Sequence, residues 1–191
     1  MTLSLILAHP DAGSLNHALA RSILEALEEV GHTVQLHDLY AERFDPVLPA
    51  EEMRTHRSTD PRVETHVREL GEADGLILVH PVWFDAPPAI LKGWVERVVR
   101  EGDAYERPAD GGFRGLLNAR AALLVTTANA PYDAAAGDAL DHFWRDFVLA
   151  AAGIDTVERV HLTPVIASDL ATRRGWLEEV AERAEALFPA D

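Results

Sequence analysis

Hydrophobic and polar residues follow two patterns that take turns along the chain. Short apolar runs recur, and the first of them is Leu3 to Ala8. Each run is followed by a longer stretch with apolar residues at helical spacing, such as Leu19, Ile23 and Leu27. The runs predict β-strands, and the spaced residues predict amphipathic helices. We therefore expect strands at Leu3–His9, Thr33–Leu39, Gly75–His80, Ala121–Thr127 and Thr156–Leu162, and helices at Leu15–Val30, Pro61–Gly71, Pro88–Arg100, Asp138–Ala152 and Asp169–Leu187.

This alternation is typical of an α/β protein. Five strands with helices between them match a doubly wound, five-stranded parallel sheet with helices on both faces. The segments Asp45–Pro61 and Arg107–Arg114 are rich in proline or charge and are expected to be surface loops. No internal repeat or linker divides the sequence, so residues 1–191 are expected to form a single domain.

The end of the first predicted strand has the features of a phosphate-binding loop. The residues H-P-D-A-G-S-L-N, from His9 to Asn16, connect this strand to the first helix, and Ser14 is a suitable N-cap for that helix. Free backbone N–H groups and the helix dipole both favour an anion at such a helix start. An ordinary capped turn would show the same pattern, so this loop alone leaves both interpretations open.

The end of the third predicted strand exposes two aromatic residues. The strand stops at Pro81, Trp83 and Phe84 follow on a turn, and a helix that starts after proline comes next. Ligands of open parallel sheets bind at such strand ends. The peptide N–H groups around Val82, Trp83 and Phe84 are therefore expected to face the polar edge of a flat ring, although the aromatic side chains would equally suit a core or an interface.

Composition narrows the classes of function. The formal charge of −15 argues against a surface that tracks nucleic acid or anionic lipid. The chain has no cysteine, which excludes disulfides and thiolate chemistry. It shows no secretion signal and no apolar run near ~18 residues, so we expect a cytoplasmic protein. The G-x-G-x-x-G and G-x-x-x-x-G-K-[ST] motifs are absent, which argues against a Rossmann dehydrogenase and an NTPase.

Longer motifs make the chain resemble a known family. P-A-I-L-K-G-W-V-E-R-V at Pro88 to Val98, D-L-Y at Asp38 to Tyr40 and F-D-P at Phe44 to Pro46 are similar to the flavodoxin-fold NAD(P)H:quinone oxidoreductases, which include the mammalian DT-diaphorases and small bacterial quinone reductases. The resemblance also covers Leu5 to Asn16, Val34 to Pro46, His80 to Tyr105 and Leu123 to Thr127. It implies a flavodoxin-like sheet of order 2-1-3-4-5, which right-handed crossovers also favour.

The resemblance further implies an activity. Members of the family pass hydride from NAD(P)H to flavin N5, and a quinone or similar flat acceptor then takes the two electrons by a ping-pong mechanism. The short form of the fold favours FMN over the alternative, FAD. A homodimer is implied as well, with the apolar stripes of Ala89–Val99 and Phe143–Ala152 as its expected seam, although a helix packed on a sheet needs such a stripe anyway.

Cofactor-binding roles carry over to particular positions. The phosphate loop corresponds to His9, Ser14, Leu15 and Asn16, and the ring-binding segment to Pro81, Val82, Trp83 and Phe84. Thr126 and Thr127 match the Thr-Thr that ends the fourth strand, but Ala128 and Asn129 replace the Gly-Gly that follows in the family. The tyrosine and histidine that assist hydride transfer in mammalian members lack clear counterparts, which leaves Tyr132 as the candidate catalytic residue.

Two other functions remain open. A-H-P-D at Ala8 to Asp11 is similar to the start of zinc-dependent deacetylases, but Ala12 and Gly13 stand where those enzymes have Asp and Glu. Five histidines, namely His32, His37, His56, His66 and His161, are expected at the surface or at strand edges without metal-ligand spacing, so no metal site is predicted. A flavin-binding regulatory subunit of a transport system is the other alternative, because small relatives of the quinone reductases serve as such accessory proteins.

Overall fold

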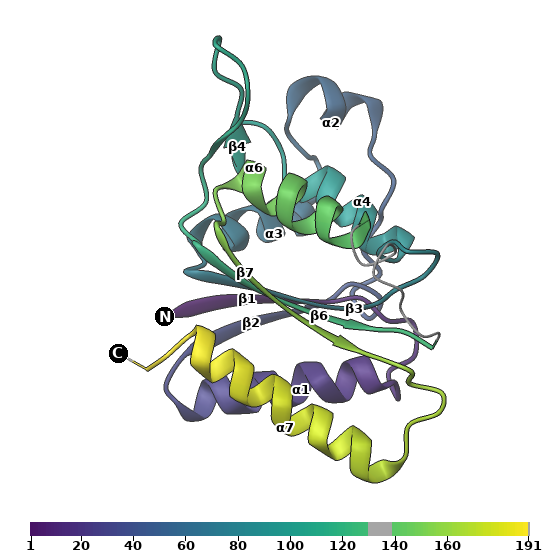
Figure 1. Ribbon diagram of the computed structural model, residues 1–191. Coiled ribbons are helices and arrows are strands. Elements are labelled where there is room, and N and C mark those ends of the chain that lie inside the picture. Colours follow the sequence, from purple (N-terminus) through teal and green to yellow (C-terminus); the bar gives the residue numbers. More distant parts are fainter. Residues whose placement is uncertain (130–138, 191) are drawn as a thin grey trace.

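A five-stranded parallel sheet forms the centre of the protein (Figure 1). The computed structural model describes residues 1–129 and 139–190. The strands are β1 (Thr2–Leu7), β2 (Thr33–Asp38), β3 (Gly75–Pro81), β6 (Ala121–Thr127) and β7 (Thr156–Leu162). Their order is β2-β1-β3-β6-β7, and every pair is parallel. The predicted α/β flavodoxin-like fold and its 2-1-3-4-5 order are therefore confirmed.

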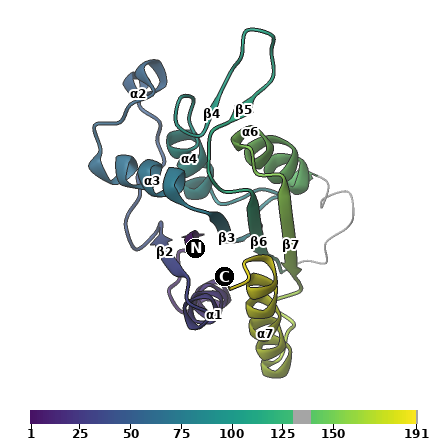
Figure 2. The same ribbon diagram turned by 90° about the vertical axis from the view of Figure 1, so that its left-hand side faces the viewer.

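Helices cover both faces of the sheet, as Figure 2 shows from a second direction. One face carries α1 (Leu15–Glu29) and α7 (Leu170–Leu187), and the other carries α3 (Pro61–Glu72), α4 (Ala89–Val98), the π-helical segment η1 (His142–Leu149) and α6 (Ala150–Ala152). These bounds agree with the predicted helices to within about two residues. The predicted start of the fourth helix, Asp138, lies outside the described residues.

Two predicted loops contain short elements that the sequence pattern missed. The segment Asp45–Pro61 includes α2 (Ala50–Thr55), and Arg107–Arg114 is flanked by a small antiparallel pair, β4 (Tyr105–Glu106) and β5 (Arg114–Gly115). A six-residue helix is too short to be stable alone. It is held by tertiary contacts instead, because Glu52 of α2 accepts hydrogen bonds from the buried guanidinium of Arg97 on α4.

The burial of each strand follows its place in the sheet. All seven residues of β3 are buried, because this central strand has helices on both faces. The edge strands are less buried, because every residue of β2 is partly or fully exposed and only Val160 and Leu162 of β7 are buried. Apolar side chains of α1 and α7 pack on one face, and those of α3, α4 and η1 pack on the other. Among the described residues, no helix is both long and apolar enough to cross a bilayer.

Gly93 lets α4 lie directly against the chain that follows β2. An ideal Cβ atom at this position would be 2.2 Å from the carbonyl oxygen of Pro46 and 2.4 Å from its Cβ. Only hydrogen fits in that space. The close approach explains why glycine stands inside a helix, where it is otherwise unfavourable. It also fixes α4, and with it the segment that joins β3 to α4.

We predict that Gly93→Ala lowers the free energy of unfolding by about 2 kcal/mol, because the added methyl group would collide with the backbone of Pro46. Gly175→Ala is the matched control, since Gly175 lies within α7 and an added Cβ would meet nothing within 4 Å. That control is expected to raise stability by a few tenths to about 1 kcal/mol. Urea unfolding of both variants measures the difference, and equal stability of the two variants would contradict the packing argument.

Candidate cofactor site at the carboxyl ends of three strands

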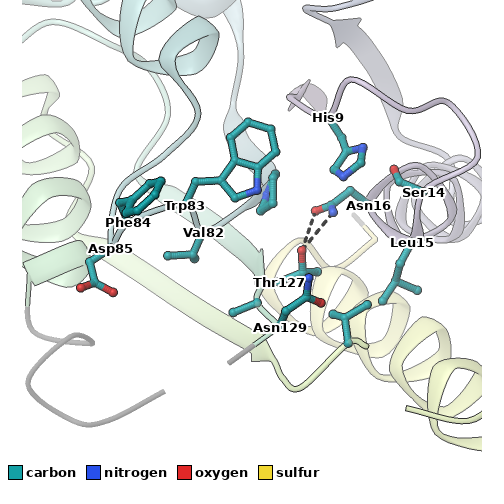
Figure 3. Close-up of a pocket in the computed structure, with 13 residues that line it drawn as sticks. His9, Ser14, Leu15, Asn16, Val82, Trp83, Phe84, Asp85, Thr127 and Asn129 are labelled. Atoms are coloured by element: carbon teal, nitrogen blue, oxygen red, sulfur yellow. Dashed lines mark hydrogen bonds between the residues drawn. The ribbon is translucent and has the colours of Figure 1, made fainter. Parts of the chain in front are cut away.

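A cavity of about 540 Å³ lies where β1, β3 and β6 end (Figure 3). This volume is typical of small-molecule sites. Its walls come from the loop between β1 and α1, the turn after β3, the end of β6 and the loop after β7. The lining residues are His9, Ser14, Leu15, Asn16, Pro81, Val82, Trp83, Phe84, Asp85, Thr127, Ala128, Asn129 and Val165.

The loop after β1 is organised by Asp11. Its Oδ1 accepts a hydrogen bond from the N–H of Gly13 at 2.9 Å, and its carbonyl accepts one from the N–H of Ser14 at 3.0 Å. Nδ1 of His9 lies 3.1 Å from the N–H nitrogen of Asp11 and 3.2 Å from its carbonyl oxygen, so the ring is held against the loop. Burial lowers the pKa of His9 and favours the neutral ring. Nε2 of His9 makes no hydrogen bond to the described residues, so it is left for a ligand of the cavity that His9 lines.

Ser14 begins α1 and also forms part of a chain of polar side chains. As predicted, it is the N-cap of α1. Its Oγ lies 2.9 Å from Nδ1 of His17, and Nε2 of His17 lies 2.9 Å from Oδ2 of Asp38 at the end of β2. The sequence reasoning missed His17, because a histidine in the first turn of a helix has no distinctive spacing.

A buried hydrogen bond joins the start of α1 to the end of β6. The side-chain amide of Asn16 donates to Oγ1 of Thr127 at 3.0 Å, and Figure 3 shows this contact at the floor of the cavity. Both residues are only 3% exposed. The pair holds together two segments that are far apart in the sequence and face the same cavity.

The turn after β3 has an unusual backbone. Phe84 and Asp85 both have positive φ angles, 52° and 56°, although neither is glycine. Residues Trp83 and Ala86 exchange two backbone hydrogen bonds and close a tight two-residue turn. Such a conformation is strained for side chains with a Cβ atom, and strain of this kind is concentrated at functional sites.

The hydrogen bonds of this turn differ from the sequence-based expectation for its N–H groups. The N–H of Val82 donates to the carbonyl of Thr127, and that of Trp83 donates to Ala86, so both are used within the protein. The N–H groups of Phe84 and Asp85 find no acceptor among the described residues. Of the three expected donors only the N–H of Phe84 is therefore left for a ligand, and the N–H of Asp85 adds a second one.

His80, at the end of β3, holds the residue that precedes the aromatic turn. It is fully buried, its Nδ1 donates to the carbonyl of Pro81 at 2.8 Å, and its Nε2 accepts from the indole N–H of Trp144 at 3.1 Å. Burial lowers the pKa of His80 to about 4, so the ring is neutral near pH 7. A neutral ring suits one donor and one acceptor contact, and it ties η1 to the end of β3.

The structure brings together all of the predicted cofactor-binding residues except Thr126. The side chain of Thr126 is buried, and its Oγ1 lies 2.8 Å from Nδ1 of His161 on β7. Consecutive residues of a strand face opposite sides, so only Thr127 faces the cavity. The cavity adds Asp85 and Val165, which no pattern in the sequence indicated. Tyr132, the candidate catalytic residue, lies outside the described residues.

The apolar stripes proposed for a dimer seam are largely used within the chain. Leu91, Trp94 and Val98 of α4, and Trp144 and Leu149 of η1, belong to the hydrophobic core on one face of the sheet. Phe147 remains 58% exposed. The stripes therefore need no partner to explain them, and the homodimer stays a prediction.

A second polar cluster lies beside β2, where the sequence indicated only surface histidines. His66 is buried, and so is His32, which corrects the expectation for these two residues. Nδ1 of His37 lies 3.0 Å from Oε1 of Glu42, and Nε2 lies 2.8 Å from Oε2 of Glu69. Nε2 of His66 lies 2.9 Å from the other oxygen of Glu42. The approach of β2 and α3 brings these residues together.

The hydrogen bonds of this cluster require protons at positions where a metal ion would need free lone pairs. His37, Glu42 and His66 place three possible ligand atoms within 4.8 Å of one another. However, the indole N–H of Trp94 donates to Nδ1 of His66 at 3.0 Å, so Nε2 must carry the proton of the neutral ring. A metal at Nε2 would require that proton to leave. Burial opposes ionisation of Glu42, but hydrogen bonds from His37 and His66 outweigh it and lower the pKa of Glu42 to about 2.

Comparisons with known proteins identify the family of this chain. A family described as having a flavodoxin-like fold matches residues 1–187. NAD(P)H dehydrogenase (quinone) 1 of Cavia porcellus is 34% identical over 145 residues, which cover 66% of this chain and 53% of that protein. The chain thus matches about half the length of this relative. An uncharacterized NAD(P)H oxidoreductase of Haemophilus influenzae is 28% identical, and the match covers 97% of this chain and 95% of that protein.

Solved structures extend the likeness over nearly the whole chain. The NAD(P)H:quinone oxidoreductase of Methanothermobacter marburgensis has a TM-score of 0.86 and 25% identity, with 98% of this chain and 97% of that chain covered. A protein of Streptococcus mutans UA159 has the same TM-score and 29% identity, with 97% and 100% covered.

We predict that the His37 cluster makes stability fall as the pH rises. Burial alone would lower the pKa of His37, but its hydrogen bonds to Glu42 and Glu69 outweigh burial and raise it above the usual 6.5. A raised pKa in the folded state stabilises the protein below about pH 6.5, and this contribution is lost as the pH rises through the folded-state value. The difference in unfolding free energy between the wild type and His37→Gln should therefore shrink with rising pH. Urea unfolding at several pH values measures it, and a constant difference would refute the assignment.

Proposed function

The chain belongs to the flavodoxin-like-fold family that includes the NAD(P)H:quinone oxidoreductases, and from this premise we propose that it is a flavin-dependent NAD(P)H oxidoreductase acting on a quinone or another flat acceptor. One observation carries the proposal. The cavity has a helix start suited to phosphate at one end and an aromatic turn with free N–H donors at the other.

The residues of the cavity fit a flavin nucleotide. The first N–H groups of α1 and the Ser14 hydroxyl are donors suited to a phosphate, and His9 lines the same cavity. Phe84 and Asp85 supply free N–H groups for the carbonyl and nitrogen atoms of a ring edge. Trp83 is 42% exposed, and its ring lies 6.3 Å from that of His9, so its indole would cover one side of the ring system. The buried pair of Asn16 and Thr127 fixes the floor between the two ends.

A bound flavin would supply the hydride chemistry, accepting two electrons from NAD(P)H and giving them to the acceptor. The protein then has to bind and orient the partners and to exclude water from the reacting face. Val82, Trp83 and Leu15 are suited to this, since they present apolar surface to the cavity. Donor and acceptor would use the same face in turn, so we expect ping-pong kinetics.

A second cavity bears on the choice of flavin. It has a volume of about 390 Å³ and shares Ser14 with the first cavity, so it continues outward from the phosphate end along α1. Its lining includes Arg21 and Ser22 of α1 and Leu177 of α7. FMN ends at its phosphate, whereas FAD continues with an AMP half that carries a second phosphate. The sequence led us to expect FMN, but this adjoining space favours FAD, and we propose FAD as the cofactor.

A zinc deacetylase receives no support from the same loop. Nδ1 of His9 already accepts a hydrogen bond from the peptide of Asp11, and the carboxylate of Asp11 accepts one from Gly13. Both side chains are therefore engaged in shaping the loop. A regulatory flavoprotein would need the same cavity, so the experiment below has to separate binding from turnover.

We predict that the apoprotein binds FAD, that the oxidised-flavin absorption bands bleach with NADH or NADPH under anaerobic conditions, and that they return when a quinone is added. Absorption spectra recorded during reconstitution and reduction measure all three steps. A protein that binds neither FAD nor FMN would refute the proposal. Flavin binding without reduction by either nucleotide would favour the regulatory role instead.

We also predict that Arg21→Ala weakens FAD binding by roughly five- to tenfold, because it removes a cation from the second cavity, and leaves FMN binding unchanged. Arg183→Ala is the matched control, since this exposed arginine of α7 pairs with Glu158 and lines neither cavity. Titrations followed by flavin fluorescence give the affinities of the wild type and both variants for FAD and for FMN. Equal loss of FAD and FMN affinity, or no loss of either, would contradict the placement of the AMP half.

A further inference from the structure

The contacts among Ser14, His17 and Asp38 point to a role that goes beyond ordinary helix capping. Resting on the proposed function, we propose that His17 is a positioning residue for the flavin phosphate: when protonated, it turns the Ser14 hydroxyl toward the phosphate, so that binding of the phosphate and protonation of His17 favour each other. The protons and lone pairs that these three side chains offer determine which atom donates in each contact.

Asp38 determines which nitrogen of His17 carries a proton. Its Oδ1 accepts from the N–H groups of Tyr40 and Ala41, both at 3.1 Å, and its Oδ2 lies 2.9 Å from Nε2 of His17. An ionised carboxylate can only accept hydrogen bonds, so Nε2 of His17 must be a donor. In the neutral ring, Nδ1 then has no proton and accepts one.

With neutral His17, the hydroxyl of Ser14 is turned away from the cavity. Oγ of Ser14 lies 2.9 Å from Nδ1 of His17, so the hydroxyl proton is donated to the ring. The side of Oγ that remains presents lone pairs. A phosphate oxygen placed there would meet another acceptor, which is unfavourable.

With protonated His17, the same contact reverses its direction. Nδ1 then donates to Oγ of Ser14, and the backbone N–H of His17 donates to the same oxygen at 3.4 Å. Both lone pairs of Oγ are occupied, so its proton has to point to another acceptor. Ser14 lines the cavity, and the hydroxyl becomes a donor for a phosphate oxygen.

Other charged groups near His17 set the background for this coupling. The loop after β1 contributes His9 and Asp11, and the ring of His9 lies 6.3 Å from that of His17. On α1, Arg21 and Glu25 line the second cavity together with His17, and Leu177 is the contribution of α7 to that cavity. Asp38 is the group in direct contact with the distal nitrogen of His17. The substitutions below change that contact and leave His9, Asp11, Arg21 and Glu25 in place, although Asp38→Asn also removes the charge of Asp38 itself.

Two variants test whether the direction of the hydrogen bond between His17 and Ser14 matters, or only the presence of a histidine at position 17. His17→Gln keeps a polar side chain that does not titrate. Asp38→Asn keeps Oδ1 for Tyr40 and Ala41, while its NH₂ group can donate to Nε2 of His17. Neutral His17 would then carry its proton on Nδ1 and donate to Ser14 at every pH. His142→Gln is the matched control, because this exposed histidine of η1 pairs with Asp146 and does not line the cavity.

The test measures affinities for FMN and FAD by quenching of flavin fluorescence between about pH 5 and about pH 8, the range in which histidine side chains usually change charge. Riboflavin, which lacks the phosphate, is the ligand control. As the pH rises, we expect the affinity of the wild type for both nucleotides to fall by roughly tenfold more than that of His17→Gln. Asp38→Asn should bind both nucleotides tightly, and its affinity should depend on pH as little as that of His17→Gln. All four proteins should bind riboflavin alike, since a change in fold would affect riboflavin as well.

The outcomes distinguish the proposal from the function on which it rests. Identical pH profiles for FMN and FAD in the wild type and both variants would overturn the coupling while leaving the oxidoreductase proposal intact. Equal weakening of riboflavin and the nucleotides in His17→Gln would show a structural role and would overturn it as well. A wild-type protein that binds no flavin would overturn both. If His17→Gln does not fold, Asp38→Asn and the wild type still decide, because a shared pH profile in these two refutes the coupling.

Discussion

Parallel pairing of β1 with β3, and of β3 with β6, is the constraint on which the site depends. It brings three carboxyl ends to one edge of the sheet, where the chain leaves β1 toward α1 and β2 and leaves β3 toward α4 and β6. The connections diverge between β1 and β3, and a crevice opens where they part. The hydrogen bond between Asn16 and Thr127 ties the two sides of this crevice together. The packing of Gly93 against Pro46 fixes the helix that follows the aromatic turn.

Three histidines of this protein make hydrogen bonds to side chains or carbonyl groups, and those partners determine which ring nitrogens need a proton. His80 is buried between one acceptor and one donor and is therefore neutral. His37 lies between two carboxylates, Glu42 and Glu69, and its raised pKa favours the cation. His17 lies between a carboxylate and a hydroxyl, a setting that accommodates either form. These three environments differ in their effect. His80 supports the aromatic turn of the cavity, His37 stabilises the edge of the sheet, and His17 contacts the Ser14 hydroxyl at the end of the cavity proposed for phosphate.

Much of this arrangement could be predicted from the sequence. Apolar runs and helical spacing located the five strands and the long helices, because burial on a sheet imposes both patterns. The family resemblance, for which P-A-I-L-K-G-W is one of the motifs, indicated most of the residues that line the cavity. The short helix α2 and the β4–β5 pair were missed because tertiary contacts, such as the pair of Glu52 and Arg97, hold them. Nothing local indicated that Phe84 and Asp85 adopt positive φ angles, so Val82 and Trp83 were expected as donors together with Phe84, and Asp85 was missed. The His37 cluster joins residues from different elements and had no signal in the spacing of the histidines.

The most direct test of the central claim is a crystal structure of the protein grown with FAD. The account predicts electron density for the flavin in the cavity between α1 and the turn after β3, with a phosphate beside Ser14 and the ring beside Trp83 and the N–H groups of Phe84 and Asp85. Flavin bound at another surface, with the ends of β1, β3 and β6 left without it, would contradict the account.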